Sequence, residues 1–317
     1  NTGLGDRTLL ANTTGALNTA VGQGSLAANT TASNNVAVGV YALEANTTGA
    51  SNTAVGQAAL TDNTTGANNT AVGYLASRVI TTGSNNVSVG AGGNLGANTT
   101  GANNVAVGYA SLGGNTTASN NTAVGFDSLA ANTTGHSNVA MGLNALNDNT
   151  TASYNTSVGT YSMDKTTTGS NNTAVGYQAL ELNTTAYQNT AVGVTALKST
   201  TTGADNTGVG FSALFANTTG YNNTAVGKSS LSTNTTGAQN TAVGMQSLLS
   251  NTTGYNNSAV STYALKANTT GHSNTAVGLS SLQVNTTGTY NAAVGSSALA
   301  ANTTGGSNTA MGQGSGY

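Results

Sequence analysis

A short sequence unit that recurs along the whole chain constrains the fold of this protein more than any other feature. The unit reads N-T-A-V-G-x-x-A-L-x-x-N-T-T-G-x-x, and we number its positions 1 to 17 from the first Asn. Units begin at Asn1, Asn18, Asn35, Asn52, Asn69 and Asn86, and then at the same interval from Asn104 to Asn308. Such a strict period is typical of solenoids, in which each repeat stacks on the one before it.

The repeat predicts one continuous solenoid over residues 1–317 rather than several globular domains. It is irregular over 69–103, where Ser77 replaces the position-9 Leu, Ile80 replaces the position-12 Asn, and the segment VGAGGNLGANTTG contains one extra residue. The last unit, 308–317, is truncated. We interpret the extra glycines as slack around the inserted residue.

Bulky and charged side chains are confined to six variable positions of the unit: 6, 7, 10, 11, 16 and 17. All twelve Tyr, three Phe and two His occur there, together with the six basic and eight acidic residues. This sorting indicates that the variable positions face solvent and that the fixed positions form the interior or tight turns. Disorder would not maintain such a phase over the length of the chain.

The residues of the unit predict an all-β fold. Two glycines per unit together with Thr, Asn and Val disfavour a helix, whereas NTAVG is compatible with a strand and NTTG with a bend. We expect a β-solenoid of about 18 coils, spaced by about 4.8 Å, in which a second short extended segment surrounds the Ala-Leu pair. Val and Leu should form its interior. The small position 3 (Ala20, Ser88, Gly208) should lie in the coil interior or at an oligomer axis.

Identical residues of successive coils should stack into ladders, with asparagine amides hydrogen-bonded along the stack. The expected ladder residues in the first units are Asn18, Asn35, Asn52, Asn69, Val21, Val38, Val55, Leu26, Leu43 and Leu60.

Composition and spacing argue against catalysis and several kinds of partner. Six basic residues and a net charge of −2 do not suit a nucleic-acid backbone, and no apolar run is long enough for a membrane helix. His136 and His272 occupy the same position eight units apart, about 38 Å at one strand spacing per coil. They therefore cannot share a metal ion, and acidic residues do not recur at fixed spacing. We predict no enzyme activity, no catalytic residues, no metal site and no cofactor.

The NTT motifs allow two interpretations. They are bends that form a ladder, or they carry glycans, because each intact motif is an N-x-T acceptor. The acceptors are Asn12, Asn29, Asn46, Asn63, Asn98, Asn115, Asn132, Asn149, Asn183, Asn217, Asn234, Asn251, Asn268, Asn285 and Asn302. A ladder of Thr also suggests ice binding, but neighbouring Thr residues in an extended chain point to opposite faces and leave one outward file.

Three tyrosines share position 16 in alternate units: Tyr187, Tyr221 and Tyr255. Exposed aromatic side chains make good adhesive contacts, so this sparse stripe is a candidate contact surface. Ordinary variation at a tolerant position is the alternative interpretation.

The motif NTAVGxxAL resembles the NSVAIGxxS-type motif in the head domains of trimeric autotransporter adhesins. It resembles even more the NTAVGYQAL…NTTG arrays of bacterial and phage tail-fibre-like surface proteins, although the unit of this chain is longer than the coil of the adhesin heads. The resemblance implies a left-handed parallel β-roll with three chains around one axis.

We therefore expect a structural fibre or adhesin shaft that is extracellular, at a cell surface or on a virion. Its expected partner is itself, as a homotrimer or an end-to-end filament. Surface glycans or a host surface are further candidate partners. The alternative function is an ice- or glycan-binding β-solenoid.

Overall fold

The computed structural model describes residues 1–316 and is an all-β parallel β-solenoid of about 18 coils. No helix occurs in these residues. The chain divides into two compact units, Asn1–Ser157 and Val158–Tyr317, and each is described by itself. The prediction of one continuous solenoid over 1–317 therefore remains a prediction.

Each coil contributes one strand of three residues, at positions 2 to 4 of the sequence unit. Unit 1 contains β1 (Thr2–Leu4), β2 (Thr19–Val21), β3 (Val36–Val38), β4 (Thr53–Val55), β5 (Thr70–Val72), β6 (Val87–Val89), β7 (Val105–Val107), β8 (Thr122–Val124) and β9 (Val139–Met141). The boundary between the units falls within β10 (Thr156–Val158). Unit 2 contains β11 (Thr173–Val175), β12 (Thr190–Val192), β13 (Thr207–Val209), β14 (Thr224–Val226), β15 (Thr241–Val243), β16 (Ser258–Val260), β17 (Thr275–Val277), β18 (Ala292–Val294) and β19 (Thr309–Met311).

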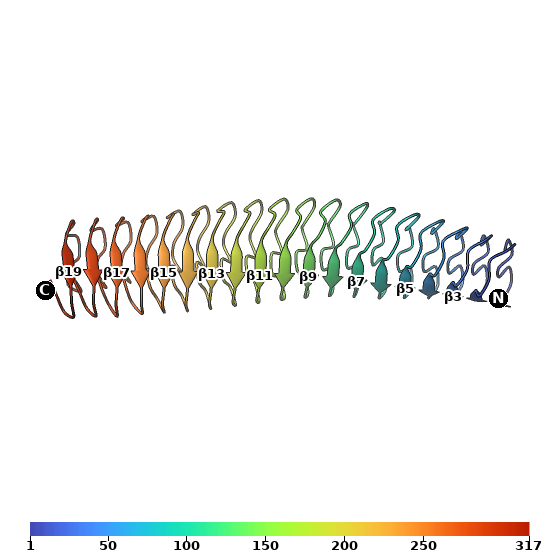
Figure 1. The fold of residues 1–317 in the computed structure, drawn as a ribbon, viewed down its shortest axis with the longest axis horizontal. Coiled ribbons are helices and arrows are strands. Elements are labelled where there is room, and N and C mark those ends of the chain that lie inside the picture. The colour runs from blue at the N-terminus through green and yellow to red at the C-terminus, as the bar shows by residue number, and fades with distance from the viewer. Residues whose placement is uncertain (317) are drawn as a thin grey trace. The chain divides into compact units, whose positions relative to one another are not determined.

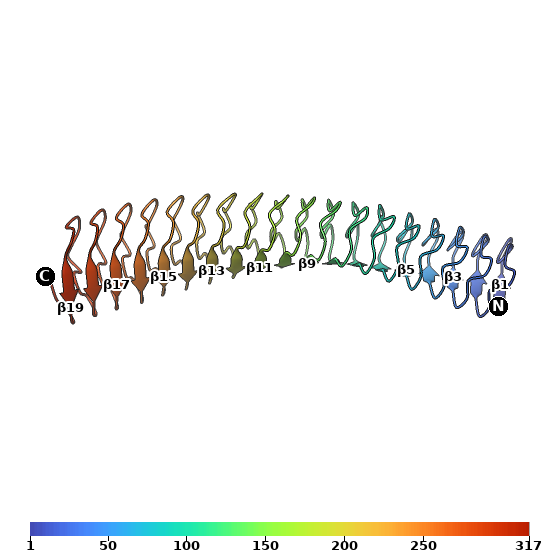
Figure 2. The same ribbon diagram turned by 45° about the horizontal axis from the view of Figure 1, so that its top comes forward.

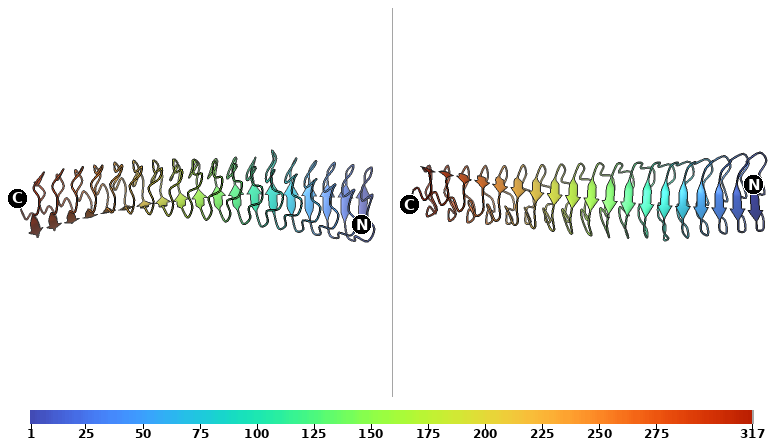
Figure 3. Two further views of the ribbon diagram at one scale, coloured as in Figure 1. Left: turned by 90° about the horizontal axis from the view of Figure 1, so that it is seen from above. Right: turned by 60° about the horizontal axis from the view of Figure 1, so that its bottom comes forward.

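Consecutive strands within each unit pair in parallel, and residues of the same repeat position lie opposite one another. In unit 1, Val38 of β3 pairs with Val55 of β4, and in unit 2 Val192 of β12 pairs with Val209 of β13. The strand arrows of each unit therefore lie side by side and point the same way (Figure 1). The turned views show the irregular segments of the coils on the side away from the strands (Figures 2 and 3).

The irregular coil in unit 1 keeps this register. Val87 of β6 pairs with Val105 of β7, although the interval between them is one residue longer than in the regular coils. The extra residue is accommodated in the turn that follows the strand, where a Cβ added to Gly93 would meet no atom within 4 Å. Open space around the insertion lets the next strand return to its place in the ladder.

The interior of each coil is thin and consists of fixed residues. In the second coil, Ala20, Ser25, Leu26 and Asn29 are completely buried. The small position 3 lies in the coil interior, since a Cβ on Gly208 would lie 3.2 Å from Cγ of Leu197 in the preceding coil. The alternative of an oligomer axis at position 3 is therefore wrong.

The expectation that Val lies in the interior is also wrong. Side chains of a strand alternate between its two faces, so burial of the position-3 Ala directs the Thr at position 2 and the Val at position 4 outward. Val55 is 36% exposed, and Val21 and Val38 are half-buried. The valines still stack in register along the outer surface of the sheet.

The Ala-Leu pair does not form a second extended segment. It lies in a turn in which the Leu backbone is left-handed, with φ of 53° at Leu43. Position 7 is left-handed as well, with φ of 59° at Tyr41. Amide N–H groups of this turn reach both neighbouring coils: Tyr41 donates to the Gln23 carbonyl of the preceding coil (2.9 Å), and Leu43 donates to the Ala59 carbonyl of the next coil (3.0 Å). The turn is thus held in the stack by backbone hydrogen bonds although it is not a strand.

The glycine that ends each strand is required by the close approach of the coils. Gly193 has φ of 133°, and a Cβ placed on it would lie 2.6 Å from the carbonyl oxygen of Gly210 in the next coil. Both the backbone conformation and the lack of space favour glycine. Ser261 occupies the same position in its unit with φ of 118°.

Candidate interaction surfaces

Within residues 1–316 no cavity is detected, no group of three or more His, Cys, Asp or Glu side chains could hold a metal ion, and no helix is long and apolar enough to cross a membrane. The places that can contact a partner are therefore the outer surfaces of the coils. Four of them are distinguished by their residues.

The first surface is the sheet face, which we define as the outward residues at positions 2 and 4 of the strands. Position 2 holds mostly Thr and position 4 mostly Val, and neither holds a charged residue in any unit. Val72 and Val175 are 37% and 38% exposed although each stacks between valines of neighbouring coils. The valines of neighbouring coils cover each Val side chain from two sides only, and its outward methyl groups remain exposed. The sheet of each unit therefore presents a continuous file of Val methyl groups beside a file of mostly Thr.

The second surface is the strand-end edge, formed by position 6, directly after the strand glycine. Many of its side chains are apolar and exposed: Val40, Tyr74, Tyr109, Phe126, Leu143, Tyr177, Val194, Phe211, Met245 and Leu279. The rings of Tyr109 and Phe126 stack across adjacent coils with their centroids 5.3 Å apart. This edge adds apolar area beside the Val file. The predicted contact residues do not include this edge, although Tyr74, Tyr109 and Tyr177 recur at this variable position of the sequence.

The third surface is the Asn-Thr corner at positions 12 to 15. Nδ2 of Asn46 donates to Oδ1 of Asn29 in the preceding coil and to the Gly49 carbonyl, both at 3.0 Å. Nδ2 of Asn63 donates in turn to Oδ1 of Asn46 at 2.8 Å. The result is a buried chain of amides along the stack.

The predicted glycan acceptors belong to this amide chain. From Asn29 to Asn285 they are completely buried, and only Asn12 and Asn302 are partly exposed. N-glycosylation modifies Nδ2, the atom that makes the ladder hydrogen bonds. The folded coils therefore leave no room for a sugar at the buried acceptors.

The two threonines of the corner differ in exposure. Oγ1 of Thr64, at position 13, donates to the Thr81 carbonyl of the next coil at 3.0 Å, whereas Thr65, at position 14, is exposed. The corner thus presents one free file of threonines, which is less than the two outward files expected of an ice-binding face.

The fourth surface is the strand-start edge, formed by positions 16 and 17, just before the strand. In unit 2 its position 16 contains Tyr187, Tyr221 and Tyr255, which are 50%, 50% and 44% exposed. Ala204 and Ala238 occupy the same position in the coils between them and are nearly buried. The three tyrosines are thus separated by one coil each.

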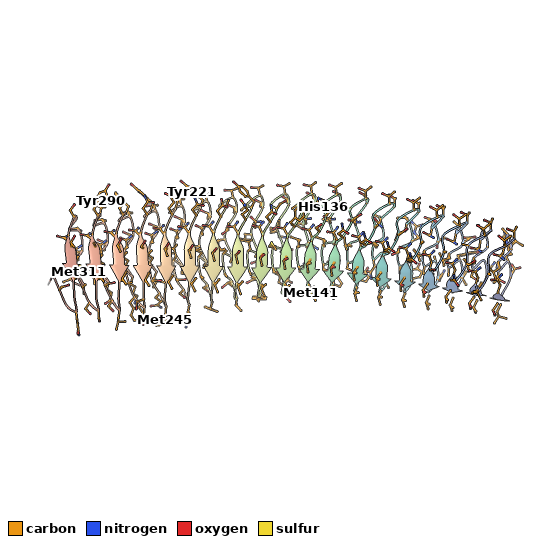
Figure 4. All side chains as sticks on the ribbon, viewed as in Figure 1. His136, Met141, Tyr221, Met245, Tyr290 and Met311 are labelled. Carbon is orange, nitrogen blue, oxygen red and sulfur yellow. The ribbon has the colours of Figure 1, made fainter. Side chains whose placement is uncertain are left out.

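The aromatic row continues towards the end of unit 2. His272 follows Tyr255 in the next coil and stacks on it with a centroid distance of 4.5 Å, and Tyr290 meets His272 edge-on at 5.3 Å. Tyr221 and Tyr290 project from one edge of unit 2, whereas Met245 projects from the opposite edge (Figure 4). In unit 1 the strand-start edge contains one aromatic pair, His136 and Tyr154, among the described residues.

These features define an all-β repeat protein of the parallel β-solenoid class. No protein family, curated protein or solved structure matches the chain.

Proposed function

We propose that this protein is a non-catalytic structural fibre or adhesin shaft, located outside the cell or on a virion, whose chains associate through the sheet face into a homotrimer. The carrying observation is that the sheet of each unit exposes a long apolar surface free of charge. Monomeric soluble proteins rarely expose contiguous apolar patches larger than a few hundred Å². Covering this face with another copy removes Val methyl groups from water without burying an ion.

Two further features support self-association. The strand-end edge places exposed apolar side chains such as Val194 and Phe211 beside the Val file, which widens the apolar surface. The resemblance of NTAVGxxAL to the heads of trimeric adhesins and to tail-fibre-like arrays suggests three chains. In such an assembly the rigid coil ladders supply the mechanical function, and the variable positions display any recognition groups.

The mass of the assembly tests this proposal. Sedimentation equilibrium at micromolar concentration should give three times the 30.8 kDa of one chain. The variant Val192→Lys/Val209→Lys/Val226→Lys, which introduces three charges on adjacent coils of the sheet face, should be monomeric with an unchanged β-type circular dichroism spectrum.

The matched control introduces the same three charges, at the same coil spacing, on the Asn-Thr corner: Thr185→Lys/Thr202→Lys/Thr219→Lys. These threonines are exposed, so this variant should remain a trimer. Even a weak interface, with a dissociation constant of about 100 µM, would give detectable assembly at that concentration. A wild-type chain that is monomeric at about 100 µM would therefore refute assembly through this face.

Ice binding is the second candidate, because the strand rather than the Thr-Thr pair presents two outward files per coil. Over β12 to β15 these files are Thr at position 2 and Val at position 4 without exception. Thermal hysteresis of the purified chain separates the two functions. Hysteresis that disappears in the three-Lys sheet-face variant but persists in the corner variant would support ice binding by a free sheet face.

A further inference from the structure

We propose that unit 1 contains a conformational joint, at which the turn side of two adjacent coils opens locally while the strands of the same coils stay paired and act as the hinge. The joint consists of the turn segments 74–80 and 91–98, which belong to the irregular part of the repeat. It lies within a single chain, so it does not depend on the proposed assembly. The side-chain ladders and the backbone bonds of the coils locate it.

The amide ladder of the Asn-Thr corner is interrupted at the joint. Ile80 occupies position 12, so the next coil offers no amide to Oδ1 of Asn63, which is buried without a hydrogen-bond partner. On the other side of Ile80, Nδ2 of Asn98 donates only to a carbonyl of its own coil among the described residues (2.9 Å), whereas Nδ2 of Asn63 also reaches Asn46 in the preceding coil (2.8 Å). The side-chain bonds that tie regular coils together are therefore missing here.

The interior of the joint combines a lost apolar contact with unpaired polar atoms. Ser77 is buried at position 9, where Leu60 and Leu95 fill the neighbouring coils, and its side chain is too short to replace theirs. Ser77 Oγ, Asn94 Oδ1 and Ser111 Oγ, from three successive coils, are buried without a partner. Such atoms destabilise the closed state, because they regain hydrogen bonds when water reaches them. Opening therefore costs less free energy here than in a regular coil.

Backbone hydrogen bonds between coils are also missing on the turn side of the joint. In regular coils the position-7 amide donates to the preceding coil, as Ala58 does at 2.9 Å, and the position-11 amide donates to the next coil, as Asp62 does at 3.0 Å. In the described part of unit 1 the corresponding amides of Val79, Gly92 and Ala110 make no such bond. The turn segments are thus less firmly attached to their neighbours.

The strand side of the same coils is intact. Val72 of β5 pairs with Val89 of β6, and Val89 pairs with Val107 of β7. Beside the strands, the Asn86 amide donates to Oδ1 of Asn69 at 2.9 Å, as the equivalent asparagines do in regular coils. The sheet therefore continues through the joint and can hold the coils together while the turn side opens.

Two glycines connect the hinge to the opening segment. Gly92 and Gly93 have φ of 77° and 83°, and a Cβ on Gly93 would meet no atom within 4 Å. The connection can therefore rotate without collision. In a shaft built from these coils, the joint is the place where unit 1 yields to bending while its sheet remains continuous.

Hydrogen–deuterium exchange of the full chain, read by mass spectrometry with residue-resolved fragmentation, tests the proposal. The amides of Ser77 and Leu95 donate to the next coil at 3.0 and 3.1 Å, much as the Leu43 amide does at 3.0 Å. Despite these equal bonds, the protection factors of Ser77 and Leu95 should be at least about tenfold lower than that of Leu43. Val87 in β6 should stay as protected as Thr53 in β4, because both donate within the sheet at 2.8 Å.

A repair variant gives both coils the residues of the regular unit: Ser77→Leu/Ile80→Asn/Asn94→Ala with Gly93 deleted. Protection of the Leu95 amide should rise at least about tenfold, to the level of Leu43, because the ladders are restored. The matched control, Thr82→Ala, changes an exposed residue of the same coil and should leave all exchange rates unchanged.

Three outcomes would overturn the proposal: equal protection of Leu95 and Leu43 in the wild-type chain, a folded repair variant that exchanges as fast as the wild type, or exchange of the β6 amides as fast as that of the joint. The last outcome would show that whole coils unfold and that no strand hinge exists. None of these results bears on the sheet-face interface, whose failure is read from the mass of the assembly in sedimentation.

Discussion

Removing one asparagine from the buried amide ladder, by Asn251→Ala, should destabilise unit 2 far more than its small change in volume suggests. Nδ2 of Asn251 donates to Oδ1 of Asn234 (2.8 Å) and to the Gly254 carbonyl (2.9 Å), and its Oδ1 accepts from Nδ2 of Asn268 (2.9 Å). The side chain is completely buried, so water cannot replace these bonds in the folded state.

The expected loss follows from these three bonds. Each contributes about 1 kcal/mol net, and a buried acceptor left without a donor costs a further 1–3 kcal/mol or so. The Gly254 carbonyl keeps a donor from Asn240 and Nδ2 of Asn268 keeps the Gly271 carbonyl, so the stranded group is Oδ1 of Asn234. We therefore expect the free energy of unfolding to fall by about 4–6 kcal/mol.

Guanidinium denaturation followed by circular dichroism measures the loss, and hydrogen exchange of the amides in the neighbouring coils locates it. Thr253→Ala, two residues away and exposed, is the matched control and should change stability by less than about 0.5 kcal/mol. Asn251→Thr should lie between the two, because Thr166 in the same ladder position accepts a hydrogen bond from Asn183 at 3.1 Å. A loss below about 1 kcal/mol for Asn251→Ala would show that the amide ladder does not hold the coils together.

Four other substitutions test the remaining features of the coil by the same denaturation assay. Leu231→Ala should cost about 2–5 kcal/mol because the side chain is completely buried, and Val226→Ala on the sheet face of the same coil should cost less than about 1 kcal/mol; equal losses would contradict the outward direction of Val. Gly193→Ala should cost several kcal/mol, on the order of 3, because its Cβ would meet the Gly210 backbone in a left-handed conformation. Ser261→Gly should instead stabilise the chain by about 1 kcal/mol, since φ is 118° there, and a destabilised variant would contradict the strain argument.

The sequence by itself determined the period of the coil, the all-β class and most of the residues that are buried. Each sequence unit gives one coil, and the confinement of charged and aromatic residues to six positions marks the exposed sites. Asparagine and leucine at positions 1, 9 and 12 are buried because every coil repeats them against the next. These features are predictable because they depend only on which residues recur at each position.

The face of the strand that points into the coil could not be predicted in the same way. In Thr-Ala-Val either the Ala or the Thr and Val must face inward, and the apolar, nearly invariant Val suggested the wrong choice. The tertiary structure decided it, because the Leu of the turn segment fills the interior and leaves room only for a small side chain at position 3, such as Ala20, Ser88 or Gly208. The 3.2 Å distance between a Cβ on Gly208 and Cγ of Leu197 shows how little space remains.

The left-handed backbone at the leucines was equally hidden, because the local sequence disfavours it and hydrogen bonds formed in the folded stack, such as that from the Leu43 amide to the Ala59 carbonyl of the next coil, stabilise it. The exposed surfaces of the coils follow from the inward position of Ala in the strand and from the left-handed turn at the leucines. Outward Val creates the apolar sheet face, and the return of the chain to the same place in every coil brings Tyr255 and His272 into contact across one full repeat of the sequence. The sequence therefore determined which residues repeat, whereas the packing of the turn against the strand decided which of them a partner can reach.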